Sequence, residues 1–144
     1  MAAGAVDEAA GYPELGREVP FGASRLDFCL RRGSRRKDEL WIEVKTATMS
    51  VGDGVVAFPD AVTTRGRRHL DELLALRRRG ARAMLLFCVA RTDARTVRPA
   101  DEIDPAYGEA LRRAVAGGVE VVARACTIDD AGLALGQALP VDLG

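Results

Sequence analysis

Apolar and polar residues alternate along two nearby stretches of the chain, and this alternation predicts two neighbouring β-strands. The first is the end of the extended segment 17–30, where Leu26, Phe28 and Leu30 are expected to share an apolar face. The second is 40–46, where Leu40, Ile42 and Val44 lie on one side and Trp41, Glu43 and Lys45 on the other. The charged loop between them favours a hairpin. A third strand is predicted over 55–58, after the turn signal Asp53-Gly54.

Two helices and two further strands are predicted in the second half of the chain. Leucines at helical spacing indicate a helix over 65–79, which Thr64 can cap at its start. The continuous apolar run 83–90 is typical of a strand buried on both faces. A second helix begins at Asp104-Pro105 and precedes a last strand, 119–128.

The order of these elements predicts how the sheet is connected. Three strands close together in the sequence fit an antiparallel meander. Each of the two later strands follows a helix, which fits crossover connections onto the same sheet. The expected fold class is therefore α/β, with a mixed sheet of about five strands and flanking helices.

Length, charge and cysteine content narrow the classes of protein to consider. The 144 residues suit one domain, expected over 16–144 after a flexible lead-in, 1–15. The formal net charge is zero, so attraction to nucleic acid must come from local patches. The longest apolar run is too short to cross a bilayer, and the N-terminus has no secretory signal. Three separated cysteines suit a reducing compartment, so we expect a cytoplasmic protein without a membrane partner.

A hairpin of the first two strands would gather charged side chains on one face. With its loop centred near residue 35, Asp27 lies opposite Glu43, and Arg25 lies opposite Lys45. Glu43 and Lys45 share a face because side chains alternate along a strand. Two adjacent carboxylates stay ionised only if a cation neutralises them, and oxygen ligands suit Mg²⁺ or Mn²⁺. The sequence therefore predicts a divalent-metal site.

Such a set of residues suits phosphodiester chemistry. A metal held by Asp27, Glu43 and the Val44 carbonyl would lower the pKa of its bound water and polarise a phosphate oxygen. Lys45 would orient the water or stabilise charge on the phosphate. The alternative is a solvent-exposed strand face, where Asp, Glu and Lys commonly form cross-strand ion pairs.

Five separated motifs resemble the SfsA family, the sugar fermentation stimulation proteins, from about residue 17 to 143. They are Ser24-Arg25-Leu26-Asp27-Phe28, Ile42-Glu43-Val44-Lys45, Phe58-Pro59-Asp60-Ala61-Val62-Thr63, Arg65-Gly66 and His69-Leu70. The resemblance implies a restriction-endonuclease-like, PD-(D/E)xK fold and a DNA-binding role linked to sugar-utilisation genes. Family members usually begin with an OB-fold domain, which this chain is expected to lack because it is too short.

The resemblance also assigns residues one by one. It matches Asp27 to the nuclease aspartate, and Glu43 with Lys45 to the (D/E)xK element. Glu18 matches a family glutamate before the first strand and is a weaker candidate for holding metal or supporting its ligands. Pro59-Asp60 looks like the "PD" of the nuclease signature, but it follows the (D/E)xK element instead of preceding it.

Further polar residues of the matched motifs are candidates to contact nucleic acid or to support the metal ligands. For Asp60 and Thr63 the alternative to such a role is that they only shape a turn. Arg65 and His69, one helical turn apart, point toward the site or belong to a solvated surface. Arg25 belongs to the same group of candidates. The basic loop 31–37 tracks a phosphate backbone or is a solvated hairpin tip.

Three functions stay open: a DNA-binding module, a divalent-metal nuclease, and a small-molecule or protein-interaction domain on the same scaffold. The set Asp27, Glu43 and Lys45 favours a retained metal site, and the resemblance favours DNA binding. A single histidine and the lack of a Gly-rich phosphate loop give no support to Ser-His-Asp or dinucleotide chemistry. We predict binding of DNA, with RNA as the alternative, and phosphodiester hydrolysis with Mg²⁺ or Mn²⁺. A homodimer would double the phosphate contacts.

Overall fold

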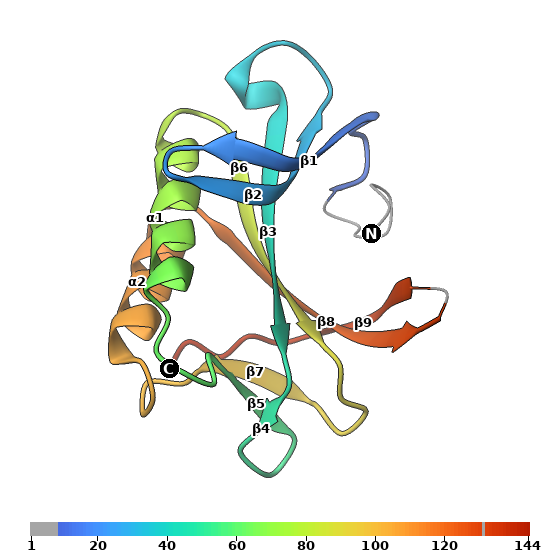
Figure 1. Cartoon of the computed structure of the whole chain (residues 1–144), viewed down its shortest axis with the longest axis vertical. Helices are drawn as coiled ribbons and strands as arrows, with labels where there is room; N and C mark the ends of the chain where they lie inside the picture. The colour runs from blue at the N-terminus through green and yellow to red at the C-terminus, as the bar shows by residue number, and fades with distance from the viewer. Residues whose placement is uncertain (1–8, 131) are drawn as a thin grey trace.

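The computed structural model of the chain describes residues 9–130 and 132–144. Within these residues, six strands form a mixed sheet, and two helices lie together along one of its faces (Figure 1). In spatial order the strands are β1 (Glu14–Phe21), β2 (Ser24–Arg31), β3 (Glu39–Ala47), β6 (Arg82–Val89), β8 (Glu120–Asp129) and β9 (Gly132–Leu139). The predicted α/β class with a mixed sheet is confirmed.

The centre of the sheet is parallel, as the sequence predicted. β3 pairs with β6, and β6 with β8, all in parallel. α1 (Thr64–Arg78) belongs to the connection from β3 to β6, and α2 (Pro105–Ala116) to the connection from β6 to β8. β6 is buried along almost its whole length, which explains why its sequence is continuously apolar.

The predicted third strand of a meander does not join this sheet. β5 (Val55–Phe58) forms a second, three-stranded sheet with β4 (Met49–Ser50) and β7 (Thr96–Pro99). The meander prediction is wrong because β3 already has a partner on each edge, β2 on one and β6 on the other. β5 pairs instead with β7 and with the short β4.

Two hairpins of the main sheet go beyond the sequence prediction. The extended segment 17–30 contains two strands, β1 and β2, joined at Gly22, whose φ of 60° suits glycine. β1 begins at Glu14, and Ala9 and Tyr12 before it are buried. At the other end of the chain, β9 folds back onto β8 and is the last strand.

Capping residues set where the helices begin. Thr63, and not the predicted Thr64, caps α1: its hydroxyl accepts a hydrogen bond from the Gly66 N–H at 2.9 Å. Asp104 caps α2 by accepting from the Tyr107 N–H at 3.0 Å. The apolar sides of both helices pack on the sheet face that carries Trp41 and Leu85. Neither helix combines the length and apolarity needed to cross a bilayer.

Candidate functional site

The candidate site lies where β2 and β3 separate. Their antiparallel pairing runs from Arg31–Glu39 to Phe28–Ile42, in the predicted register, and ends there. Among the described strands, only β6 pairs with β3 from Glu43 to Ala47. Asp27 and Glu43, the next residues along the two strands, therefore lie at the point of divergence.

Two hydrogen bonds cross the gap between the diverging strands. The Asp27 N–H donates to Glu43 Oε2 at 3.2 Å, and the Val44 N–H donates to Asp27 Oδ2 at 2.8 Å. Each carboxylate is thus held by the backbone of the other strand. The N–H and C=O of one strand residue point to the same side, so the Val44 carbonyl faces the same gap.

Glu43 is also held by two cationic or protonatable groups on the helical face of the sheet. Lys45 Nζ lies 3.3 Å from Glu43 Oε1, and His69 Nδ1 of α1 lies 3.0 Å from the same oxygen. His69 Nδ1 and Lys45 Nζ are 2.9 Å apart. A protonated Nδ1 donates to Glu43, whereas an unprotonated Nδ1 accepts from Lys45. Glu43 is 4% exposed and His69 1%, so this cluster is almost dry.

The two carboxylates have opposite pKa shifts. Burial raises the pKa of Asp27 above its ordinary value, and the neighbouring charge of Glu43 adds to this, against the hydrogen bond from Val44. Burial also acts to raise the pKa of Glu43, but the hydrogen bond with His69 and the charge of Lys45 hold it below its ordinary value. The protein therefore compensates the charge of Glu43 and leaves that of Asp27 poorly compensated, which favours a bound cation.

The protein atoms available to a metal are few. In the described parts of the chain, no three His, Cys, Asp or Glu side chains are gathered around a potential metal position. The ligands are limited to the carboxylates of Asp27 and Glu43 and the Val44 carbonyl. Mg²⁺ is commonly held by one or two carboxylates, with waters and substrate phosphates completing its octahedron. The residues present therefore fit such an ion.

Glu18 lies across from Asp27 but outside the pair of carboxylates. The β1–β2 register continues on both sides of it, at Arg17–Phe28 and Val19–Leu26, and skips this position. Glu18 has a φ of 50° and an exposed side chain. The predicted alternation along β2 is wrong at this break, because Leu26 packs beneath the helices and Phe28 packs on the opposite face.

Arg25 does not lie opposite Lys45, because the β2–β3 ladder has ended before it. Instead it meets Arg65 and Arg68 of α1 around a surface groove of about 270 Å³, beside the β1–β2 turn. Ala23, Ser24 and His69 complete the lining. The buried His69 side chain therefore lies between this groove and Glu43, and it is not part of a solvated surface.

Thr63 and Asp60 have no hydrogen bond or ion pair with Asp27 or Glu43 among the described residues. Besides capping α1, Thr63 donates its N–H to Asp104 Oδ2 at 2.9 Å, which links the starts of the two helices. Asp60 is exposed, and within 9–130 and 132–144 no hydrogen bond or ion pair joins it to Asp27 or Glu43. Thr63 therefore fixes the start of α1, and the predicted role of Asp60 stays a prediction.

Tyr107 of α2 is a buried polar residue whose hydroxyl interacts electrostatically with Glu43. It is fully buried, and its hydroxyl has no hydrogen-bond partner among the described residues. Burial raises its pKa, and the charges of Glu43 and Asp104 add to this effect. No sequence signal separates it from an ordinary core aromatic.

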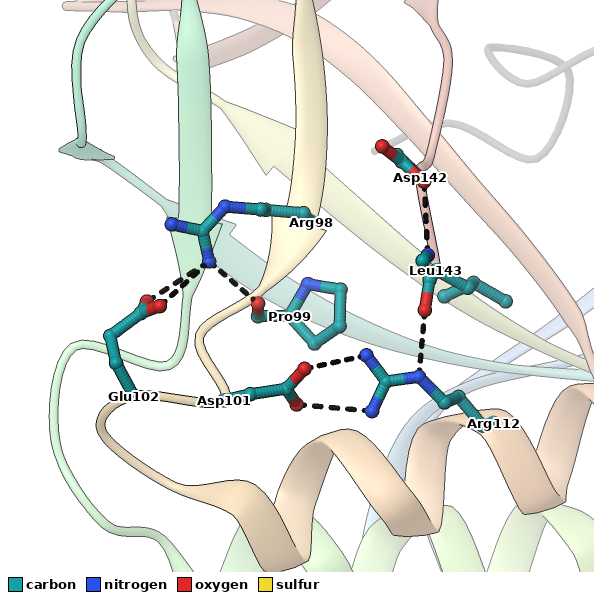
Figure 2. A pocket seen from close by; sticks show the side chains of 8 residues that line it. Arg98, Pro99, Asp101, Glu102, Arg112, Asp142 and Leu143 are labelled. Atoms are coloured by element: carbon teal, nitrogen blue, oxygen red, sulfur yellow. Dashed lines mark hydrogen bonds and ion pairs between the residues drawn. The ribbon is translucent and has the colours of Figure 1, made fainter.

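Two other basic regions contain ion pairs. In the loop 31–37, Arg31 and Arg36 pair with Glu39 at 3.4 and 2.9 Å. A hollow of about 240 Å³ lies near the end of the chain. Its lining side chains are drawn in Figure 2. There Arg98 pairs with Glu102 at 3.0 Å, and Arg112 pairs with Asp101 at 2.6 Å while donating to the Leu143 carbonyl at 2.7 Å.

A family model described as the sugar fermentation stimulation protein RE domain matches residues 1–132 of the chain. The chain belongs to this family. It is 47% identical over 145 residues to a sugar fermentation stimulation protein homolog of Thioalkalivibrio sulfidiphilus and 49% identical over 146 residues to one of Pseudomonas paraeruginosa. These alignments cover 99% of the chain and 60% and 61% of the relatives. The chain thus spans about three-fifths of the length of these relatives.

A solved structure has the same fold. SfsA of Pyrococcus furiosus, in complex with Ca²⁺, superposes with a TM-score of 0.83 at 31% sequence identity. The superposition covers 95% of this chain and 58% of that chain. The predicted family and the predicted fold class are both confirmed.

Proposed function

We propose that this domain binds DNA and hydrolyses its phosphodiester bonds with Mg²⁺ or Mn²⁺ as cofactor, in the cytoplasm. The observation that supports it best is the convergence of Asp27 and Glu43 at the split between β2 and β3, with the charge of Asp27 poorly compensated. The Ca²⁺ complex of the related Pyrococcus furiosus protein supports a divalent ion for this fold. The three free cysteines fit a reducing compartment.

In this proposal each residue of the site has a defined task. Asp27, Glu43 and the Val44 carbonyl hold the cation, which when bound supplies an acidic water and polarises a phosphate oxygen. Lys45, whose Nζ is 3.3 Å from Glu43, orients the attacking water or stabilises charge on the phosphate. His69 contacts both side chains and fixes their positions.

A DNA-binding module without hydrolysis is the second candidate. The groove beside α1 favours it, because Arg25, Arg65 and Arg68 can contact phosphates without any metal. Both candidates need nucleic acid as partner, and they differ only in whether the carboxylates take part in chemistry.

Cleavage assays separate the two candidates. The protein is incubated with single-stranded DNA, double-stranded DNA and RNA, with Mg²⁺, Mn²⁺ or EDTA. We expect metal-dependent cleavage that Asp27→Asn, Glu43→Gln and Lys45→Met each reduce at least about 100-fold while binding is kept. Glu102→Gln is the matched control and should cleave normally, because Glu102 is an exposed acid that pairs with Arg98 and not with a residue of the site.

Two results would contradict hydrolysis. If Asp27→Asn and Glu43→Gln both cleaved at the wild-type rate, the cleavage would come from a contaminant. Salt-dependent binding without cleavage under any metal condition would leave the binding module as the function.

A further inference from the structure

The groove beside α1 combines three arginines from two elements that are distant in sequence. Arg25 comes from β2, and Arg65 and Arg68 come from the first two turns of α1. Arg68 Nε donates to Ser24 Oγ at 2.9 Å, which holds this guanidinium against the β1–β2 turn. Figure 1 shows that turn lying beside α1. The groove is thus formed by the tertiary structure and not by one basic segment.

None of these arginines is neutralised. Within 9–130 and 132–144, Arg25, Arg65 and Arg68 have no carboxylate partner, although ion pairs occupy the other arginine-lined hollow. The first turn of α1 also contains no acidic residue. Positive side chains at this positive end of the helix dipole are unfavourable unless an anion is present. The groove therefore has the electrostatics of an anion site.

The groove is separated from the carboxylates by one imidazole ring. His69 lines the groove, while its Nδ1 contacts Glu43 at 3.0 Å and Lys45 at 2.9 Å. An anion in the groove is thus close to a phosphate placed over Asp27 and Glu43. Planar guanidinium groups match phosphate oxygens in geometry as well as in charge.

We propose that this groove binds a backbone phosphate adjacent to the one placed over Asp27 and Glu43, with Arg68 and Arg25 as the contacting residues. The inference rests on the proposed function, because it assumes that a nucleic-acid strand lies over the carboxylates. It assigns to Arg68 a role that no motif of the sequence indicated. The groove sets where the strand lies and carries no base specificity.

The test measures binding in EDTA, so that the metal site does not contribute. The affinity for a fluorescein-labelled single-stranded DNA is measured by anisotropy between 50 and 200 mM salt for the wild type and for Arg25→Gln/Arg68→Gln. Each lost phosphate contact should lower the slope of log Kd against log salt by about 0.7. The control Arg77→Gln/Arg78→Gln removes two charges at the other end of α1 and should keep the wild-type slope.

The outcomes separate the groove from the proposed nuclease. A reduced slope in Arg25→Gln/Arg68→Gln, with the control unchanged and circular dichroism native, supports the groove. An unchanged slope in this variant, or an equal reduction in the control, overturns it. If the wild type binds through the groove but does not cleave with Mg²⁺ or Mn²⁺, the hydrolysis proposal is refuted and the groove proposal stands. Wild type with no salt-dependent binding refutes both.

Discussion

The hollow near the end of the chain and the groove beside α1 are both lined by several arginines, but they differ in what neutralises this charge. In the hollow near the end of the chain, Arg98 and Arg112 are paired with Glu102 and Asp101 (Figure 2). In the groove beside α1, Arg68 donates to the Ser24 hydroxyl, and none of the three arginines has a carboxylate partner among the described residues. The first hollow stabilises the fold, whereas the second has charge available for a ligand.

The same contrast exists between the two carboxylates of the site. Glu43 is compensated by Lys45 and His69, whereas Asp27 is held by one backbone N–H and stays near the charge of Glu43. Residue type alone therefore does not identify a functional group. What identifies it is whether the fold has supplied a partner, and substitution of paired and unpaired groups tests this distinction.

Glu43→Gln should have the largest effect, because Glu43 is both a metal ligand in the proposal and the partner of two side chains. We expect cleavage to fall at least about 100-fold. In EDTA at pH 7 the free energy of unfolding should fall by about 2 kcal/mol, because a buried charge-assisted contact is lost. Urea unfolding measures this, and Glu102→Gln should change it by less than about 0.5 kcal/mol. Equal stability of both variants would contradict the compensation of Glu43.

Asp27→Asn should abolish stabilisation by metal without destabilising the metal-free protein. In the wild type, metal at about 100 times its Kd should add about 2.7 kcal/mol, and the variant should gain almost nothing. The comparison of Tm with Mn²⁺ and with EDTA measures this. A full Mn²⁺-dependent rise in Tm for the variant would remove Asp27 from the site.

The pH dependence of the metal-free protein gives the sign of the Asp27 effect. Because the folded-state pKa of Asp27 is raised, its contribution to stability is present below the ordinary pKa and is lost as pH rises through the raised value. Above that pH, Asp27→Asn should be as stable as the wild type or more so. Thermal unfolding of both proteins in EDTA from pH 4 to pH 8 checks this. If the variant became less stable relative to the wild type as pH rises, the predicted sign would be wrong.

Arg112→Gln should affect stability and not binding. It removes the pair with Asp101 and the hydrogen bond to the Leu143 carbonyl, so a loss of up to about 1 kcal/mol is expected. Its affinity for DNA should equal that of the wild type, in contrast to Arg25→Gln/Arg68→Gln. Reduced DNA affinity in Arg112→Gln would show that paired arginines also contribute to binding.

Tyr107→Phe should have the smallest effect. The Tyr107 hydroxyl is buried without a hydrogen-bond partner in the described residues, so its removal should leave stability unchanged or raise it by up to about 1 kcal/mol. The cleavage rate should stay within about threefold of the wild type, since the ring and its packing remain. A loss of stability would show that the hydroxyl has a partner in solution.

Local sequence patterns were sufficient for the parts of the fold that depend on near neighbours. Hairpin spacing predicted the register of Phe28 with Ile42, and continuous apolarity predicted β6. The pattern failed for β5, because pairing of β3 with β6 is a long-range event that closes the edge β5 would need. The pattern also failed for Leu26. Alternation of side chains assumes an unbroken strand pairing, and the β1–β2 pairing is interrupted at Asp27, so Leu26 packs on the other face.

The sequence by itself determined the family, the α/β class, and the proximity of Asp27, Glu43 and Lys45, since these follow from motifs and from strand periodicity. Only the tertiary structure decided that His69 is buried against Glu43, and that Arg25 of β2 and Arg68 of α1 line the same groove. The physical reason is that pairing and burial of a charge depend on which distant elements pack together. A side chain's type and spacing do not contain that information.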